Sequence, residues 1–217
     1  MSDTDSFIDE VSEEVRRDRL FRLMKRWGWI PVLLILLMVG GAAFNEWSKA
    51  RNQKAAQKLG TEILEAIQLQ DASGREAAYR AIKTDGDALA LLALLESGDA
   101  LAEGDFDRAV SSLGSIAKNA DLSAPYRHLA ELKLLLILGD DLPVAERIDR
   151  LEAIANPGDP YRLLAEEQLA IAEVSSGNIS AALERLQAIL ADTEVTAGLR
   201  RRVSQLIVAL GGDLTPA

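Results

Sequence analysis

The sequence predicts an all-α protein in which a single transmembrane helix precedes a right-handed solenoid of antiparallel helix pairs that ends in a capping helix. Three observations predict this fold. Eighteen uncharged residues run together near the N-terminus, aromatic residues make up only 5% of the chain while Ala and Leu dominate, and helical segments recur 35 residues apart. Long apolar runs are typical of membrane spans, and Ala- and Leu-rich repeats of this length are typical of stacked helices.

Residues 1–26 form a polar leader. Within it Phe7, Val11 and Val15 are spaced four apart, which lines up one apolar stripe on a helix. We therefore expect a short amphipathic helix on the cytoplasmic side. The alternative is a solvated charged leader that only orients the chain.

Residues 27–44, WGWIPVLLILLMVGGAAF, are predicted to cross the membrane. At ~1.5 Å per residue the run is ~27 Å long, close to the ~30 Å hydrocarbon core. Indole rings prefer the headgroup layer, so Trp27 and Trp29 mark one edge of the apolar slab and Trp47 the other. The residues assigned to the span include Trp27, Trp29, Pro31, Gly40, Gly41 and Phe44.

Two other readings of this run remain open. A buried core helix could be equally apolar, but it would not need flanking charges and tryptophans. A cleavable signal peptide would find small residues near a cut site at Gly40 to Ala43, but 26 residues precede the run, which favours a retained anchor.

Basic residues favour a cytoplasmic N-terminus and a C-terminal domain on the other side of the membrane. Six of them precede the span: Arg16, Arg17, Arg19, Arg22, Lys25 and Arg26. Four more follow it, at Lys49, Arg51, Lys54 and Lys58, so the positive-inside rule acts only moderately here.

The remainder divides into a juxtamembrane helix or linker at 45–60, a repeat domain at 61–211 and a tail at 212–217. Residues 1–51 hold eight basic and eight acidic side chains, so the net charge of −10 lies entirely beyond residue 51. Such an acidic domain repels nucleic acid, and we expect no nucleic-acid partner. The absence of cysteine excludes disulfides and thiolate metal sites.

The repeat is clearest between residues 125–154 and 160–189, which are identical at 11 of 30 positions at a shift of 35. A fainter copy relates residues 108–117 to 146–155 at a shift of 38, with the three extra residues near Asp140 to Pro143. Repeats of this length indicate helix pairs that bury their apolar faces only by stacking on one another.

The turns GDFDRAV at Gly104 and GNISAAL at Gly177 resemble the tetratricopeptide repeat. The resemblance implies that Phe106 and Ile179 pack under the turn, and that Ala109 and Ala182 lie where two helices come closest. The pattern departs from regular repeats because the large aromatic early in the first helix is missing. Prolines open the next pairs, at Pro125 and Pro160, instead of closing the second helices.

Taken together, the leader SFIDEVSEEVRRDRLFRL, the single span, the exit NEWSKAR and the repeats resemble the ancillary subunit family of the SecYEG translocon. The resemblance implies a bacterial inner-membrane protein with a cytoplasmic N-terminus and a periplasmic domain. It also implies two kinds of protein partner, the SecYEG channel and periplasmic chaperones, between which exported chains would pass.

The sequence offers no catalytic constellation, and we expect no enzyme, cofactor, metal site or small-molecule substrate. His128 is the only histidine, and the phosphate-loop, dinucleotide and nucleophile-elbow motifs are absent. His128 aligns with Leu163, so a half-buried helix position is expected. The carboxylates near Asp105 and Asp140 lack the ligand order of a calcium loop and are expected to be solvated turns.

Candidate interaction residues are Tyr126, Arg127, Tyr161 and Arg162, because the Tyr-Arg pair recurs at the repeat spacing and both residue types are common anchors. The simpler reading is that each tyrosine packs between repeats. Arg200, Arg201 and Arg202 either cap the solenoid or bind lipid or an acidic partner.

The sequence thus favours a non-enzymatic, membrane-tethered module for protein binding. One alternative is a structural scaffold for an envelope or cell-division complex that acts partly through the span, where Gly40 to Ala43 would allow another helix to approach closely. A second alternative is a hydrolase that depends on His128 or an acidic pair.

Overall fold

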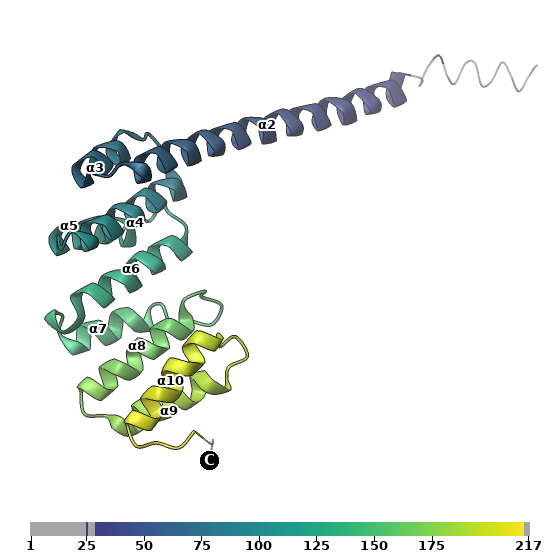
Figure 1. Cartoon of the computed structure of the whole chain (residues 1–217). Helices are drawn as coiled ribbons and strands as arrows, with labels where there is room; N and C mark the ends of the chain where they lie inside the picture. The colour runs from purple at the N-terminus through teal and green to yellow at the C-terminus, as the bar shows by residue number, and fades with distance from the viewer. Residues whose placement is uncertain (1–24, 26–28, 215–217) are drawn as a thin grey trace, which may run out of the picture. The chain divides into compact units, whose positions relative to one another are not determined.

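The computed structural model describes residue 25 and residues 29–214, without the side chains at positions 31 and 32. Within this part the chain forms nine α-helices and one short 3-10 helix, and no strand (Figure 1). The predicted all-α fold class is confirmed. The predicted leader helix, Trp27 and the last three residues lie outside the described part.

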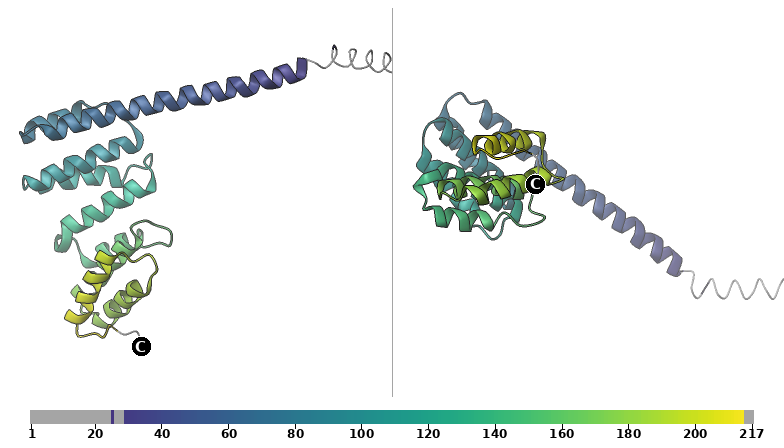
Figure 2. Two further views of the ribbon diagram at one scale, coloured as in Figure 1. Left: turned by 45° about the vertical axis from the view of Figure 1, so that its right-hand side comes forward. Right: turned by 90° about the horizontal axis from the view of Figure 1, so that it is seen from below.

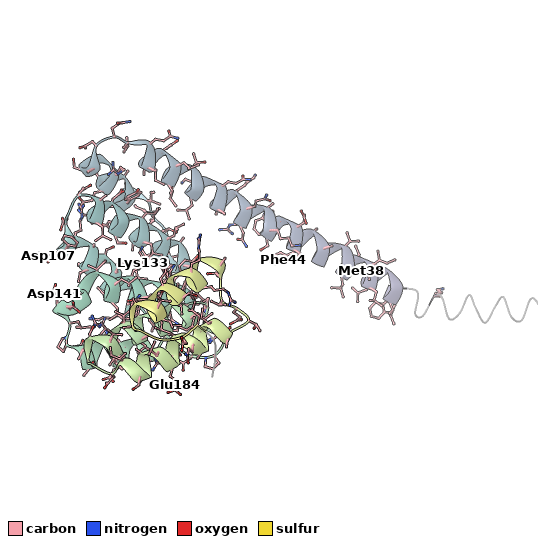
Figure 3. All side chains as sticks on the ribbon, turned by 60° about the horizontal axis from the view of Figure 1, so that its bottom comes forward. Met38, Phe44, Asp107, Lys133, Asp141 and Glu184 are labelled. Atoms are coloured by element: carbon pink, nitrogen blue, oxygen red, sulfur yellow. The ribbon has the colours of Figure 1, made fainter. Side chains whose placement is uncertain are left out.

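The chain divides into two compact units, Met1–Thr61 and Glu62–Ala217. Helix α2, Trp29–Gln68, contributes to both. Its first part carries large apolar side chains that are exposed, and Met38 and Phe44 project outward from it in Figure 3. From Asn45 onward polar residues interrupt the apolar run.

None of the helices in residues 29–214 is both long enough and apolar enough to cross a membrane. The predicted span at 27–44 is therefore not found there. Its first two residues lie before the described part of α2, and the helix becomes polar within a few residues of Phe44.

The second unit consists of helices that follow one another in chain order (Figure 2). After the end of α2, they are α3 (Ala72–Ala81), α4 (Gly86–Ala102), α5 (Phe106–Ala117), α6 (Ala124–Leu138), the 3-10 helix η1 (Gly139–Asp141), α7 (Val144–Glu152), α8 (Arg162–Ser175), α9 (Ile179–Ala191) and α10 (Ala197–Ala209). Helices α4 and α5, and α8 and α9, pack closely as pairs. Helices α6 and α7 follow each other as the pair between them but pack mainly on α5 and on α8, respectively, and α10 packs on α9.

Glycine explains the recurring turn inside a pair. Gly104 and Gly177 have φ of 77° and 80°, a left-handed conformation that glycine adopts without steric cost. The next residue then reaches back: Asp105 N donates to Ala100 O at 2.8 Å, and Asn178 N donates to Glu173 O at 2.9 Å. These bonds satisfy carbonyls at the end of the first helix and aim the chain into the second.

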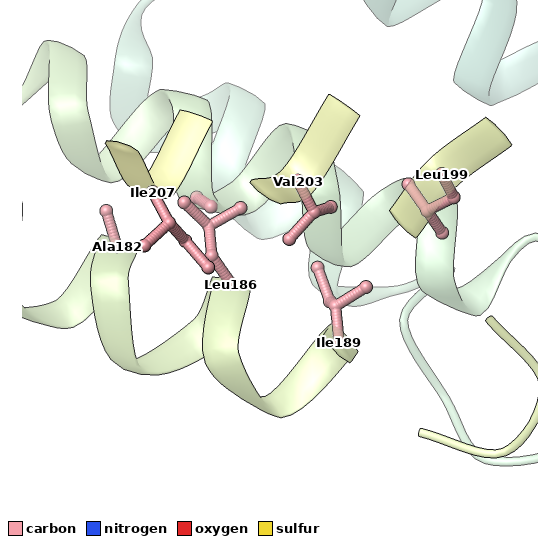
Figure 4. Close-up of a cluster of buried hydrophobic side chains, with 7 residues drawn as sticks. Ala182, Leu186, Ile189, Leu199, Val203 and Ile207 are labelled. Carbon is pink, nitrogen blue, oxygen red and sulfur yellow. The ribbon is translucent and has the colours of Figure 1, made fainter. Parts of the chain in front are cut away.

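The core consists of three apolar clusters along the unit. One joins α4, α5 and α6, the next joins α6, α7 and α8, and the last joins α8, α9 and α10. In the last cluster Leu186 and Ile189 of α9 face Leu199, Val203 and Ile207 of α10 (Figure 4). Helix α10 thus covers the end of the core. Burying each of these side chains contributes roughly 1.5–3 kcal/mol to the free energy of folding.

Of the four predicted repeat-packing residues, two are buried and two are exposed. Ala109 and Ala182 are fully buried, which fits a close approach of two helices. Phe106 and Ile179 are exposed, so the prediction that they pack under the turn is wrong. Each is the first residue of its helix, and side chains there point back past the helix start, beyond the partner helix.

Candidate functional site

A groove lies between α6, α8 and α10, with a volume of about 580 Å³. Its lining is mainly aliphatic and consists of Leu132, Leu136, Leu164, Glu167, Gln168, Ile171, Arg202, Gln205, Leu206 and Ala209. Leu136 is 54% exposed and Ile171 is 36% exposed. The groove therefore presents aliphatic carbon to its surroundings.

The repeat generates this lining. Leu136 and Ile171 stand 35 residues apart, so they occupy equivalent positions on α6 and α8. On α8, Leu164, Gln168 and Ile171 are spaced four and three apart, which places them on one face of the helix. This surface was not predicted from the sequence, although Leu136 and Ile171 are both aliphatic residues at equivalent positions of the repeat.

An ion pair with a buried carboxylate joins two walls of the groove. Glu167 of α8 accepts hydrogen bonds from Nε of Arg202 at 2.8 Å and from Nη2 at 2.7 Å. The Glu167 side chain is only 6% exposed, whereas Arg202 is 53% exposed. The hydrogen bond with Glu167 raises the pKa of the Arg202 guanidinium. This bidentate geometry fixes α10 against α8.

The arginine run at residues 200–202 serves the end of the solenoid. Besides the Arg202 pair, Nη1 of Arg200 donates to the carbonyl of Leu190 at 3.1 Å, which ties α10 to α9. Arg201 is exposed. Two of the three arginines thus have structural partners, in line with the capping reading.

Among the predicted Tyr-Arg anchors, the tyrosines pack against the core and Arg162 forms ion pairs. Tyr126 and Tyr161 pack against neighbouring core clusters. Burial, and then the nearby Asp159 and Tyr126, raise the pKa of Tyr161. Arg162 already holds Asp192 at 2.8 Å and Glu194 at 2.9 Å.

Two further residues, Asp192 and Arg127, bear on the role of these anchors. The pKa of Asp192 is lowered, chiefly by the backbone N–H of Glu194 and then by Arg162. Arg127 is half-buried, and its Nε has no hydrogen-bond partner among the described residues. These contacts assign Arg162 a structural role, and its binding to another protein stays a prediction, as does that of Tyr126, Arg127 and Tyr161.

The family described as tetratricopeptide repeat-like domain matches residues 24–157, more than half of the 217 residues. The chain belongs to this family. No curated protein and no solved structure matches the chain. Tetratricopeptide repeat-like domains are typically non-catalytic modules that bind protein partners.

The matched residues end just before α8, so the family covers the α6 wall of the groove and not the other two. The tetratricopeptide repeat-like pattern nevertheless continues, because α8 and α9 repeat α6 and α7 at a shift of 35. The groove thus combines a matched repeat with a further copy and the terminal helix.

His128 takes part in a joint between repeats. Its Nδ1 contacts the carboxylate of Asp159, a buried side chain in the loop before α8. The same carboxylate accepts the backbone N–H of Tyr161 at 2.9 Å. The half-buried helix position expected for His128 is confirmed, but its partner was missed because 31 residues separate the two.

The carboxylates at the turn between α4 and α5 also have hydrogen-bond partners within the domain. Asp99 accepts from Arg75 at 2.8 Å, Glu103 accepts from Arg108 at 2.6 Å, and Asp105 caps α5 by accepting from the Arg108 backbone N–H at 3.1 Å. The described residues contain no cluster of three or more ligand side chains that could hold a metal ion. These carboxylates stabilise the turn between α4 and α5.

A second hollow, of about 420 Å³, lies over α8 and α9 and has a different character. Arg185 in its lining contacts Glu166 and also pairs with Glu173 at 2.7 Å. Arg162 and Asp192, which also line it, pair with each other. Because most of its charges already pair within the domain, with the exposed Glu184 as the exception among its lining residues, this hollow offers a partner less than the aliphatic groove does.

Proposed function

We propose that this tetratricopeptide repeat-like domain binds an extended, apolar segment of a partner polypeptide in the groove between α6, α8 and α10. The observation that carries the proposal is the exposure of Leu136 and Ile171 at equivalent positions on neighbouring helices. Covering such carbon is favourable by roughly 25 cal/mol for each Å² removed from water.

The polar side chains of the groove favour an unfolded segment over a folded surface. The amides of Gln168 and Gln205 can each donate and accept hydrogen bonds. An extended chain has unpaired backbone N–H and C=O groups that need such partners, whereas a folded surface has satisfied most of its own. Aliphatic contacts with a few backbone-directed amides bind without demanding one sequence.

We further propose that residues 27–44 tether the domain to a bacterial inner membrane, with the N-terminus in the cytoplasm and the domain in the periplasm. The support is the uncharged sequence of this run, its tryptophan edges and the exposed apolar side chains on the first part of α2. A tether raises the effective concentration of the groove near its partners, so weak binding suffices.

Resemblance to the ancillary SecYEG subunit family suggests what these partners are. Chains that leave a translocon are unfolded and expose apolar segments, which is the chemistry that the groove accepts. The proposed role is an accessory one, in which the domain receives such segments beside the channel and passes them to periplasmic chaperones.

The alternative role is a scaffold for an envelope or cell-division complex. One observation favours it: a Cβ added at Gly40 or Gly41 would meet no atom within 4 Å, so this face of α2 is open to another helix. Replacing residues 27–44 with an unrelated span distinguishes the roles, because a scaffold acting through its span would fail and a groove binder would keep working.

Site-specific crosslinking in cells tests the proposal. A photoreactive amino acid is placed at Leu136 or Ile171 in the full chain, and at the exposed Glu184 on α9 as a control. We expect the groove positions to capture translocon subunits, exported chains or periplasmic chaperones more strongly than position 184. Capture of cytosolic proteins would contradict the topology, and equal capture at all positions would contradict the groove.

A further inference from the structure

The second helix of three successive pairs begins with an exposed apolar residue. Phe106 opens α5 and is 60% exposed, while Val144 opens α7 and Ile179 opens α9, each 37% exposed. The spacings of 38 and 35 residues equal the shifts of the sequence repeat. Single exposed apolar residues are ordinary on protein surfaces, but these three recur at one position of the repeat.

These three residues lie along one edge of the domain, which we name the turn edge. Figures 1 and 2 show the turns from α4 to α5, α6 to α7 and α8 to α9 on the same side, with the connections from α5 to α6, α7 to α8 and α9 to α10 opposite. Because the first side chain of a helix points back past the helix start, each of the three projects from this edge. The turn edge therefore carries a row of apolar groups.

Exposed acidic residues accompany the first two apolar positions. Asp107 follows Phe106, Asp141 lies just before Val144, and Figure 3 places both aspartates at the same edge. Two arginines, Arg108 and Arg147, belong to the same turns.

These arginines do not offset the acidic character of the turn edge. Their side chains are largely buried, and they pair with Glu103 at 2.6 Å and with Asp140 at 3.0 Å. The third position, at Ile179, is flanked by the uncharged Asn178 and Ser180.

We propose that the turn edge docks a basic amphipathic segment of a protein partner. Apolar residues of the partner would cover Phe106, Val144 and Ile179, and its lysines or arginines would lie against Asp107 and Asp141. The negative charge of this edge repels an anionic membrane surface. It also repels the same edge of a second copy, which carries the same charge. The surface is separate from the groove, since none of these five residues lines it.

Peptide binding to the full chain in phosphatidylcholine nanodiscs tests this docking, with empty nanodiscs subtracted. The probe is a synthetic amphipathic helix of Leu and Lys, and its counterpart replaces every Lys with Glu. The test variant carries Phe106→Ser, Val144→Ser and Ile179→Ser. The control variant changes three other exposed residues, Leu91→Ser, Val208→Ser and Leu214→Ser, and circular dichroism checks that both variants fold.

We expect the wild type and the control to bind the Leu/Lys helix, and the triple turn-edge variant to bind it at least ~10-fold more weakly. Asp107→Lys with Asp141→Lys should weaken it as well. Three results would overturn the proposal: equal binding by the turn-edge variant, equal binding of the Leu/Glu helix, or a change in oligomeric state without a change in peptide affinity. If either variant set misfolds, the single changes Phe106→Ser and Asp107→Lys give the same test.

Discussion

At the scale of residues, Glu167 is the most unusual side chain of the groove. Its equivalent one repeat earlier is Leu132, so the chain has placed a carboxylate where an aliphatic residue fits. The carboxylate is buried, and both of its oxygens accept hydrogen bonds from Arg202. A buried charge is tolerated only with such partners, so the pair holds α8 and α10 in register.

Replacing Arg202 by Ala should lower the free energy of unfolding by about 2–3 kcal/mol, because it leaves the buried Glu167 carboxylate unpaired. Glu167→Leu should cost less, since the half-exposed Arg202 can return to water. Chemical denaturation followed by circular dichroism measures both, with Arg201→Ala as the matched control that changes little. An equal loss in the free energy of unfolding for Glu167→Leu and Arg202→Ala would show that the unpaired carboxylate is not the cause.

Sequence reasoning succeeded for residues with local causes and failed for those with distant ones. Ala109 and Ala182 could be predicted because a small residue at a repeat position implies close helices. The partners of Glu167 and His128 lie 35 and 31 residues away, and no local spacing reveals such contacts. Phe106 was misjudged because its apolar character says nothing of whether a partner helix extends far enough to cover it.

At the scale of elements, glycine and proline signals located the helices well. The turns at Gly104 and Gly177 end α4 and α8, and Pro125 lies in the first turn of α6, as a residue without an N–H can. Pro160, by contrast, lies in the turn before α8, which begins at Arg162. The helix predicted to cap the end of the solenoid corresponds to α10.

Helix α10 forms one wall of the groove, so its N-terminal cap should affect stability and binding together. The Thr196 hydroxyl accepts the backbone N–H of Leu199 at 3.3 Å. We expect Thr196→Ala to reduce the free energy of unfolding by about 1 kcal/mol, a typical loss for a removed cap. Thr193→Ala, in the same loop, is the control. Identical thermal melting of the two variants would show that the cap contributes nothing.

At the scale of the whole molecule, the repeat predicted an all-α fold and a resemblance to the tetratricopeptide repeat. The match of the tetratricopeptide repeat-like domain family to residues 24–157 confirms that resemblance. The groove could not be predicted, because it exists only when three helices from different repeats are placed side by side. Hydropathy marked residues 27–44 as a span, whereas the described residues contain no helix that meets the requirements for one. Topology and partners remain proposals.

Binding of unfolded polypeptide in the groove can be measured by a binding isotherm. The full chain in nanodiscs is titrated with a fluorescent, permanently unfolded polypeptide. Leu136→Asp with Ile171→Asp places two carboxylates in the groove, and Leu91→Asp with Val208→Asp is the control on other exposed sites. We predict that the groove variant loses at least ~10-fold in affinity, or ~1.4 kcal/mol, and that the control does not. Equal affinity of all three proteins would show that unfolded polypeptide does not bind in the groove.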